Sequence, residues 1–270
     1  MKALIDSDYF AYAHGSATDD EGHPIAWPLL ASRISQQLEN IVEKAGCTEY
    51  ELFLTGGGNF REAIATIKPY KGNRPSEKPY HYQRIRDYLI KFRGATLVEG
   101  MEADDTVSIE QWKDYHSEVR QGWYPEEVLG TVLCSIDKDL DMVPGWHYNW
   151  IKDEKYWIDE VSGLRNFYKQ LLTGDTVDNI PGLFGVGKSS ALVKRINDLD
   201  LELDMYSQVV EQYEKRFGSY WWKFLLENAQ LLWMLRTDCY EHPHEEVEYR
   251  LECLEGKRNE RKEADNSTGL

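Results

Sequence analysis

Short apolar runs alternate with helical patterns over the first 160 residues, and this alternation constrains the fold more than any other feature of the chain. Strand-like runs lie at about 2–5, 51–55, 95–98, 130–136 and 148–151, and helical patterns at about 28–45, 78–92, 103–119 and 126–129. Strands that alternate with helices form a largely parallel sheet covered on both faces. The sequence therefore predicts an α/β fold with a mostly parallel central sheet flanked by helices.

The pattern becomes helical after residue 160, with segments at about 165–174, 188–197, 205–215 and 219–236. The last residues, from about 254, lack apolar periodicity and are rich in charge. Such a composition is typical of a disordered segment. We therefore expect an α/β core over 1–160, a helical region packed on it over 161–250, and a disordered tail over 254–270.

Composition sets the cellular class that we expect. The chain of 270 residues is long enough for one large α/β domain, and its four cysteines show neither a C-x-x-C pair nor zinc-site spacing. Asp6 and Asp8 interrupt the N-terminal apolar run, which argues against a signal peptide. The longest strongly apolar stretch, at 231–235, is too short to span a membrane. We expect a soluble, monomeric protein of the cytoplasm with no membrane partner.

A basic segment stands out in an acidic chain. The formal net charge is −16, yet residues 61–94 contain nine Lys and Arg against three acids. Six aromatic or imidazole side chains between 70 and 92 are interleaved with these cations. Cations that track phosphates, with rings on which unpaired bases stack, are typical of single-strand binding. The alternative for this segment taken alone is a solvated helix face.

The stretch 171–191, LLTGDTVDNIPGLFGVGKSSA, allows two interpretations. Gly182, Gly187, Lys188 and Ser189 satisfy the pattern of an ATPase phosphate loop, which requires a buried strand that leads into its first glycine. The residues before Gly182 form a polar turn with a proline, and no later apolar strand ends in Asp. The second interpretation, an acidic pair followed by a glycine-rich clamp on a DNA backbone, fits better.

Carboxylates follow the predicted strands. Because the carboxyl ends of parallel strands share one edge, where ligands bind, acids after different strands converge on one crevice. Each acid also has a local explanation as a helix cap, a first-turn acid or a turn residue. Together they would repel one another unless cations lay among them, and oxygen ligands favour Mg²⁺ or Mn²⁺. The acids that follow strands are Asp6, Glu102, Asp104, Asp105, Asp137 and Asp139, whereas Asp175 and Asp178 follow the helical pattern at 165–174.

Five motifs in this order resemble those of the 5′-nuclease family: LIDSDYFAYA, PYKGNR, EGMEADD, SIDKDL and GDTVDNIPGLFGVGKSSA. The family includes flap endonucleases, the 5′-nuclease domain of bacterial DNA polymerase I and bacteriophage 5′–3′ exonucleases, and the last are the most similar. The resemblance covers residues 2 to 240 and implies an α/β core, a helical arch at about 68–92 and a C-terminal helix–turn–helix clamp on DNA.

The resemblance also implies roles for individual residues. Asp6, Glu102, Asp104 and Asp105 match the first metal cluster, with Asp137 shared or nearby; Asp139, Asp175 and Asp178 match the second. Lys71 and Arg74 match the basic pair at the base of the arch, which also contains Lys78 and Arg84. Gly182, Gly185 and Gly187, with Lys188 beside them, match the clamp, where K⁺ can bind. Many members carry a further Asp after the second strand, where this chain has Thr55 and Gly56. Asp8 lies beside the first cluster without being a regular ligand.

We therefore expect a divalent-metal-dependent 5′–3′ exodeoxyribonuclease with flap endonuclease activity that uses two metal ions and leaves 5′-phosphorylated products. Asp6 and Asp137 would act in catalysis through the metal, and Lys71 and Arg74 on the phosphate. DNA with 5′ ends, flaps or nicks would be the substrate, RNA–DNA hybrids a further one, and the bacterial host cell the location if the chain comes from a phage. The alternatives are a structure-specific DNA-binding protein with little catalysis and a related RNase.

Overall fold

One six-stranded sheet lies at the centre of the computed structural model, which describes residues 1–74, 77–121 and 124–268. In sheet order the strands are β3 (Thr96–Val98), β2 (Glu49–Thr55), β1 (Lys2–Asp6), β4 (Thr131–Cys134), β5 (Gly145–Asn149) and β6 (Glu154–Ile158). All neighbours pair in parallel except β5 and β6, which are antiparallel. The predicted α/β class with a mostly parallel sheet is confirmed; the antiparallel edge strand is an addition.

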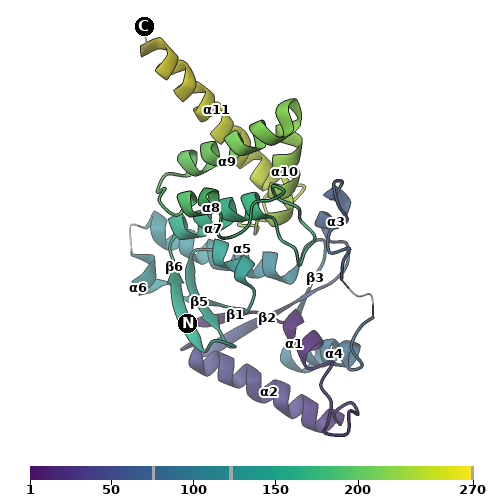
Figure 1. Ribbon diagram of the computed structural model, residues 1–270. Helices are drawn as coiled ribbons and strands as arrows, with labels where there is room; N and C mark the ends of the chain where they lie inside the picture. Colours follow the sequence, from purple (N-terminus) through teal and green to yellow (C-terminus); the bar gives the residue numbers. More distant parts are fainter. Residues whose placement is uncertain (75–76, 122–123, 269–270) are drawn as a thin grey trace. The chain divides into compact units, whose positions relative to one another are not determined.

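Helices cover both faces of this sheet (Figure 1). Helices α1 (Asp8–Ala13), α2 (Trp27–Lys44) and α4 (Tyr82–Arg93) share a core with alternate strand residues, among them Ile5, Leu54 and Val132, none more than 1% exposed. Helix α5 (Ala103–Arg120) packs on the opposite face, against β1, β2 and β4. Alternation along each strand thus divides its side chains between two apolar layers.

The described chain forms two compact units. The first unit comprises residues 1–59, 75–158 and 234–236 and contains the sheet with α1, α2, α4, α5 and the short α6 (Pro125–Val128). The second unit comprises residues 60–74, 159–233 and 237–270. Residues 60–74, which sequence analysis assigned to the nuclease core, therefore group with the helical part of the chain.

Helices build the second unit around a core that includes Phe167, Leu171, Val209 and Tyr213, all fully buried. The main helices are α3 (Phe60–Ile64), α7 (Glu160–Thr173), α8 (Ala191–Ile196), α9 (Glu202–Phe217), α10 (Trp221–Leu232) and α11 (Glu245–Thr268). Fully buried Arg61 donates to the carbonyls of Leu231 (3.0 Å) and Trp233 (2.8 Å) at the end of α10. Although it belongs to the basic segment, Arg61 therefore caps a helix and is not available to DNA.

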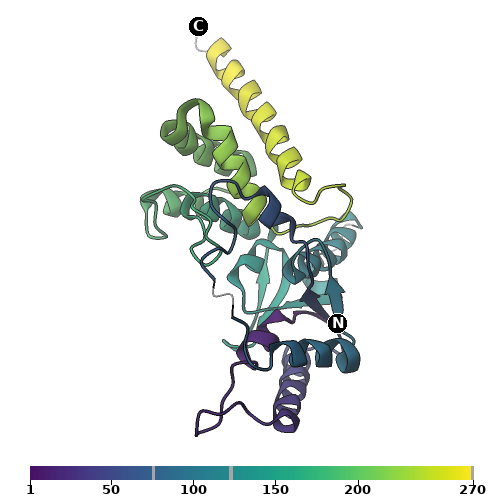
Figure 2. The same cartoon turned by 90° about the vertical axis from the view of Figure 1, so that its right-hand side faces the viewer.

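The structure contradicts the predicted disorder from residue 254. Residues 254–268 continue helix α11, which packs beside α9 and α10 (Figure 2). Buried Leu251 and Leu254 supply the apolar contacts, and the Arg258 guanidinium donates to Glu214 on α9 at 2.8 Å. The helix has no apolar stripe long enough to stand out in the sequence, because ion pairs supply much of its packing. Residues 269–270 of the predicted tail lie outside the described chain.

The arch predicted over 68–92 also differs from the structure. Its residues 68–74 belong to the second unit and those from 77 onward to the first, while 75–76 lie outside the described chain. Within α4, Ile85 and Leu89 are fully buried in the sheet core, so residues 82–92 form a core helix. No helix of the described chain is both long enough and apolar enough to cross a membrane.

Candidate active site

The order of the strands creates a switch point between β1 and β4. The chain adds β2 and β3 on one side of β1 and then returns to place β4 on the other. Ligands bind at the carboxyl ends of strands where such a reversal occurs. Asp6 ends β1, and Asp137 follows β4 as the cap of the short helix η1 (Lys138–Met142). The structure therefore places two predicted site acids on either side of the switch point.

Hydrogen bonds to backbone N–H groups fix the loops that carry these acids. Asp6 accepts from the N–H of Asp8 at 3.1 Å, and Asp137 accepts from the N–H of Asp139 at 2.9 Å. The Ser135 hydroxyl in turn accepts from the N–H of Asp137 at 3.0 Å. Asp139 pairs with the Lys138 ammonium at 2.9 Å. Each loop is thus held by a short local bond that leaves carboxylate oxygens at the edge of the sheet.

Burial and neighbouring negative charges both raise the pKa of Asp6 at this edge. Burial, the negative charge of Asp8, and then those of Asp137 and Glu102 raise this pKa to about 7, against an opposing hydrogen bond from the N–H of Asp8. Burial also raises the pKa of Asp8, opposed by Thr55 and Arg86. Carboxylates that raise one another's pKa need positive charge nearby to ionise together. The edge is therefore electrostatically suited to a cation.

Glu102, Asp104 and Asp105 open helix α5. Glu102 is its N-cap, and the Asp105 carboxylate accepts from the N–H of Glu102 at 3.3 Å in a capping box. Asp105 is fully buried and also accepts from the N–H of Leu235 at 3.4 Å. Asp104 accepts from the N–H of Asp105 at 2.7 Å. Asp104 and Asp105 thus lie in the first turn of α5, as their local explanation predicted, and Glu102 is close enough to Asp6 to contribute to its raised pKa.

In the second unit, the predicted basic pair, Lys71 and Arg74, contacts Asp178. The Lys71 ammonium lies 3.6 Å from its carboxylate, Arg74 makes an ion pair with it, and the Tyr70 hydroxyl donates to it at 2.9 Å. The N–H of Lys71 also donates to the Asp178 carbonyl at 2.9 Å, with Lys71 in the left-handed region at φ 53°. Lys71, Arg74 and Asp178 are therefore brought together, as a cluster that also includes Tyr70.

Asp175 has a different environment from Asp178. It is buried, and one carboxylate oxygen accepts from the N–H groups of Val177 (2.7 Å) and Asp178 (3.3 Å). Asp175 and Ile180 also form an isolated antiparallel bridge. Asp175 therefore forms the Asx-type turn of this loop. Asp175 shapes the loop on which Asp178 meets the basic pair.

The backbones of Gly174 and Gly182 lie in close contact where this loop closes. Gly182 has φ +56°, and a Cβ there would lie 2.2 Å from the backbone nitrogen of Gly174, which itself has φ +65°. Gly185 and Gly187 lie in the open, as does Lys188. A turn follows α7 before Gly182, and no strand of the described chain leads into it, in agreement with the argument against an ATPase loop.

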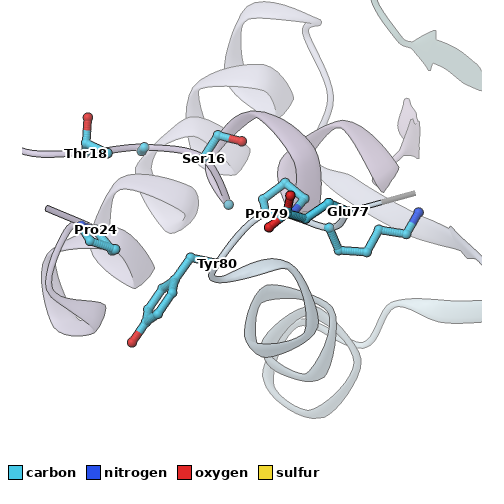
Figure 3. A pocket seen from close by; sticks show the side chains of 9 residues that line it. Ser16, Thr18, Pro24, Glu77, Pro79 and Tyr80 are labelled. Carbon is cyan, nitrogen blue, oxygen red and sulfur yellow. The ribbon is translucent and has the colours of Figure 1, made fainter. Parts of the chain in front are cut away.

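A shallow pocket of about 400 Å³ lies beside the start of α4 in the first unit. Figure 3 shows its lining side chains, with Ser16, Thr18 and Pro24 from one segment and Glu77, Pro79 and Tyr80 from the other. Tyr80 is 78% exposed. The Lys78 ammonium donates to the Tyr12 hydroxyl at 2.6 Å and lies 5.0 Å from the Tyr82 ring. Arg84 stacks over Trp27 at 4.5 Å. The aromatic and basic residues do intermingle here, as the composition predicted.

Sequence reasoning missed several side chains that organise the site, above all Arg86 and Tyr70. Arg86 is 8% exposed and pairs with Asp8 at 3.0 Å, so it is a buried structural cation. Its position on the apolar face of α4, between Ile85 and Leu89, was the signal that could have identified it. The proximity of Tyr70 to Lys71 within the PYKGNR motif was a weaker one.

The predicted acids divide between the two units. Six belong to the first and two, Asp175 and Asp178, to the second. Among the described residues, no group of three or more His, Cys, Asp or Glu side chains has an arrangement that could hold a metal ion. The chemistry of the donors still fits a hard cation, because all eight are carboxylates, whose oxygens such cations prefer.

No protein-family model matches the chain. A DNA polymerase I from Rhizobium leguminosarum is 31% identical in an alignment 164 residues long, which covers 54% of this chain but only 15% of the polymerase. Among solved structures, a complex of the bacteriophage T5 flap endonuclease with DNA and metal ions aligns over 94% of this chain and 98% of its own, with a TM-score of 0.62 and 16% identity. The chain has the T5 5′-nuclease fold. The T5 protein crystallised with metal ions aligns over 86% and 88% of the two chains, with a TM-score of 0.59 and 16% identity.

A further structure with this fold is a mutant of the T5 5′-exonuclease, with a TM-score of 0.55 and 15% identity over 86% of each chain. The resemblance to 5′-nucleases seen in the sequence motifs is thereby confirmed at the level of the T5 5′-nuclease fold. The alignment with the T5 complex covers 94% of the chain and therefore includes both the sheet and the helical part.

Proposed function

We propose that the chain is a divalent-metal-dependent 5′–3′ exodeoxyribonuclease with flap endonuclease activity. The observation that carries the proposal is the acidic edge at the β1–β4 switch point, where Asp6 ends β1, Asp137 follows β4, and burial together with the charges of Asp8, Asp137 and Glu102 raises the pKa of Asp6 to about 7. Its position in a fold shared with structures of the T5 5′-exonuclease and flap endonuclease supports a nuclease over other uses of such an edge. The products would carry 5′-phosphates.

Mg²⁺ or Mn²⁺ would be held by the carboxylates of Asp6, Glu102, Asp104, Asp105, Asp137 and Asp139 in the first unit and by those of Asp175 and Asp178 in the second. When bound, two such ions supply Lewis acidity toward the phosphodiester and lower the pKa of water. The chain's own contribution is to hold the ligand loops through the bonds from Asp8, Asp139 and Val177 N–H groups. K⁺ at the glycine-rich loop is a further proposal.

Lys71 and Arg74 would act on the phosphate. The Asp178 carboxylate pairs with the side chains of both Lys71 and Arg74, and it also accepts a hydrogen bond from the Tyr70 hydroxyl. The two basic side chains are therefore positioned before the substrate arrives. Charge fixed in advance stabilises developing negative charge without reorganisation. Lys71 and Arg74 would thus stabilise the transition state more than they strengthen binding of the ground state.

DNA with 5′ ends, flaps or nicks would be the substrate, with RNA–DNA hybrids as a further candidate. Exposed Gly185, Gly187 and Lys188 would contact duplex phosphate, and Gly182 would set the shape of their loop. Tyr80 and Lys78 beside the pocket of Figure 3 would contact unpaired bases and phosphates of the 5′ strand. Arg84, stacked on Trp27, would add positive charge nearby.

The second candidate is a structure-specific DNA-binding protein with little catalysis. The full burial of Asp105, whose carboxylate accepts from the N–H groups of Glu102 and Leu235, favours it, because a buried acid held in this way is less accessible to a metal ion. The two candidates predict the same DNA structures as ligands. They differ in whether the DNA is cut.

A cleavage assay with end-labelled DNA distinguishes them. Flapped and nicked duplexes labelled at the 5′ or the 3′ end are incubated with Mg²⁺, with Mn²⁺ or with chelator. We expect release from the 5′ end that needs the metal and is lost in Asp137→Asn. Glu39→Gln, which removes an exposed acid from α2, is the matched control and should cut normally. Binding without cutting would establish the second candidate instead.

A further inference from the structure

The end of β2 carries no acid of its own. β1 ends in Asp6 and β4 is followed by Asp137, but β2, which lies beside β1, ends in Thr55. An acid at the next residue is sterically excluded, because a Cβ on Gly56 would lie 2.5 Å from the Val98 carbonyl oxygen and 2.5 Å from the Glu99 carboxylate. The acidic edge would therefore have a gap at this strand.

The carboxylate of Asp8, from the start of α1, lies against the end of β2 at Thr55. Its Oδ2 accepts from the N–H of Thr55 at 3.2 Å. Arg86 holds the other oxygen, since its Nη1 donates to Asp8 Oδ1 at 3.0 Å and its Nη2 donates to the Thr55 carbonyl at 2.5 Å. The Thr55 hydroxyl accepts from the N–H of Ala103, the first residue of α5, at 2.9 Å. All polar groups of Thr55 therefore take part in fixing this corner.

Arg86 is a fixed support for Asp8. The side chain is 10% exposed, compared with 24% for that of Asp8, and its guanidinium lies 5.6 Å from the Tyr82 ring. The fork of a guanidinium makes two directed bonds, which a lysine ammonium cannot reproduce. A carboxylate has about four lone pairs, so the bonds from Arg86 and from the N–H and side chain of Thr55 leave acceptor capacity on Asp8.

We infer that Asp8 is the carboxylate with which this chain completes the cation-binding edge at β2, and that Arg86 is its positioning residue. The inference rests on the proposed function, because it assigns a ligand of the proposed cation. Asp8 takes the place that a strand-end acid would occupy, reached from the start of α1. The sequence signature is an acid two residues after Asp6 combined with a buried arginine on α4.

Direct binding of Mn²⁺ to the full-length protein without DNA, measured by titration calorimetry, tests the inference. Asp8→Asn should weaken binding by at least about tenfold, as loss of a residue that supports a metal site commonly does. Asp137→Asn should also weaken it, and Glu39→Gln should bind as the wild type. Adding Thr55→Asp to Asp8→Asn should restore part of the lost affinity, because a strand acid then fills the same corner.

The variants also separate a ligand from a structural ion pair. Asp8→Asn leaves the buried Arg86 charge without its partner, so the double variant Asp8→Asn/Arg86→Gln, which removes both charges, provides a second test if the single variant unfolds. Thermal unfolding in chelator establishes that each variant is folded. Weakened Mn²⁺ binding by a folded double variant supports the inference. Arg86→Lys should weaken binding less than Asp8→Asn.

Two outcomes would overturn different claims. If folded Asp8→Asn or the double variant binds Mn²⁺ as tightly as the wild type while Asp137→Asn does not, Asp8 is only an ion-pair partner and the inference is wrong. If the wild type itself binds no Mn²⁺ and cuts no DNA with Mn²⁺ present, the proposed metal-dependent function is wrong.

Discussion

Lys71 combines a charged side chain at the candidate site with an unfavourable backbone conformation. Its φ of 53° lies in the left-handed region, which a residue with a Cβ adopts at a cost of roughly 1–2 kcal/mol. The bond from its N–H to the Asp178 carbonyl and the ion pair with the Asp178 carboxylate keep it there. Strain of this kind is common where function requires one side chain in one place.

Two substitutions at Lys71 should separate stability from activity. Both Lys71→Ala and Lys71→Gly remove the ammonium, so DNA cleavage should fall by roughly 10²–10³ with a smaller effect on DNA binding. Glycine accepts a positive φ readily, so Lys71→Gly should unfold at a higher denaturant concentration than Lys71→Ala. Urea unfolding and single-turnover cleavage of a flap measure the two effects. Equal losses of affinity and rate would make Lys71 a binding residue.

His147, which is not one of the candidate metal ligands, makes the free energy of unfolding depend on pH. It is 2% exposed, and burial lowers its pKa despite a 2.7 Å hydrogen bond to the Val143 carbonyl and the charge of Asp141. Below the unfolded pKa of about 6.5, the unfolded chain binds a proton that the folded chain does not, so stability decreases as pH falls.

The free energy of unfolding should therefore fall between pH 7 and pH 5 with a slope contribution of at most about 1.4 kcal/mol per pH unit from this residue. His147→Gln should reduce that slope. Urea titrations of both proteins at several pH values, in chelator, provide the comparison. An unchanged slope would show that His147 protonates as easily in the folded protein as in the unfolded chain.

Among the elements, helix α10 anchors the segment that leads to the basic pair. Glu227 on α10 is 6% exposed and accepts from the N–H groups of Thr66 (2.8 Å) and Ile67 (2.6 Å) and from the Thr66 hydroxyl. A carboxylate suits this place because all three partners are donors. The segment that leads to Lys71 is therefore fixed four residues before it.

Glu227→Gln should destabilise the protein by about 1–3 kcal/mol, because the amide presents two donors where an acceptor is needed. Cleavage should fall as well, since the loop that carries Lys71 loses its anchor. Glu211→Gln, at an exposed pair 3.9 Å from Lys215, is the control and should change stability little. If Glu227→Gln retained full stability, the bonds of Glu227 would contribute nothing to this segment.

The elements that sequence patterns predicted well are those with continuous apolar runs. β1, β2 and β4 matched closely, because their buried residues form uninterrupted stretches. β6 was missed, since the five residues Glu154–Ile158 are at most partly buried and follow a tight turn. Six of the candidate acids were located on the sequence because they follow strands, whereas Asp175 and Asp178 follow a helix and were located through the motif that contains them. The Asp8–Arg86–Thr55 corner was not, because its three residues come from separate segments and no local pattern relates them.

At the scale of the whole molecule, the net charge of −16 opposes the approach of DNA. Repulsion between an acidic protein and DNA acts over long distances, and salt weakens it, which favours association. Salt also weakens the contacts between basic side chains and phosphates, which opposes association. Cleavage under kcat/KM conditions should therefore peak at an intermediate salt concentration. Initial rates between about 10 and 300 mM KCl, a range over which the screening length shortens from ~30 Å to well below 10 Å, test this expectation. If the initial rate fell steadily from the lowest salt concentration, attraction between basic side chains and phosphates alone would govern the association with DNA.

The chain passes between its two units five times, at residues 59–60, 74–75, 158–159, 233–234 and 236–237. A single nick between Ile158 and Asp159 would consequently give two fragments, each of which contributes a segment to the other's unit: residues 60–74 from the first fragment and 234–236 from the second. Arg61 would still cap α10 across the nick. The protein is thus suited to fragment complementation, in which two pieces expressed apart recombine into one folded protein.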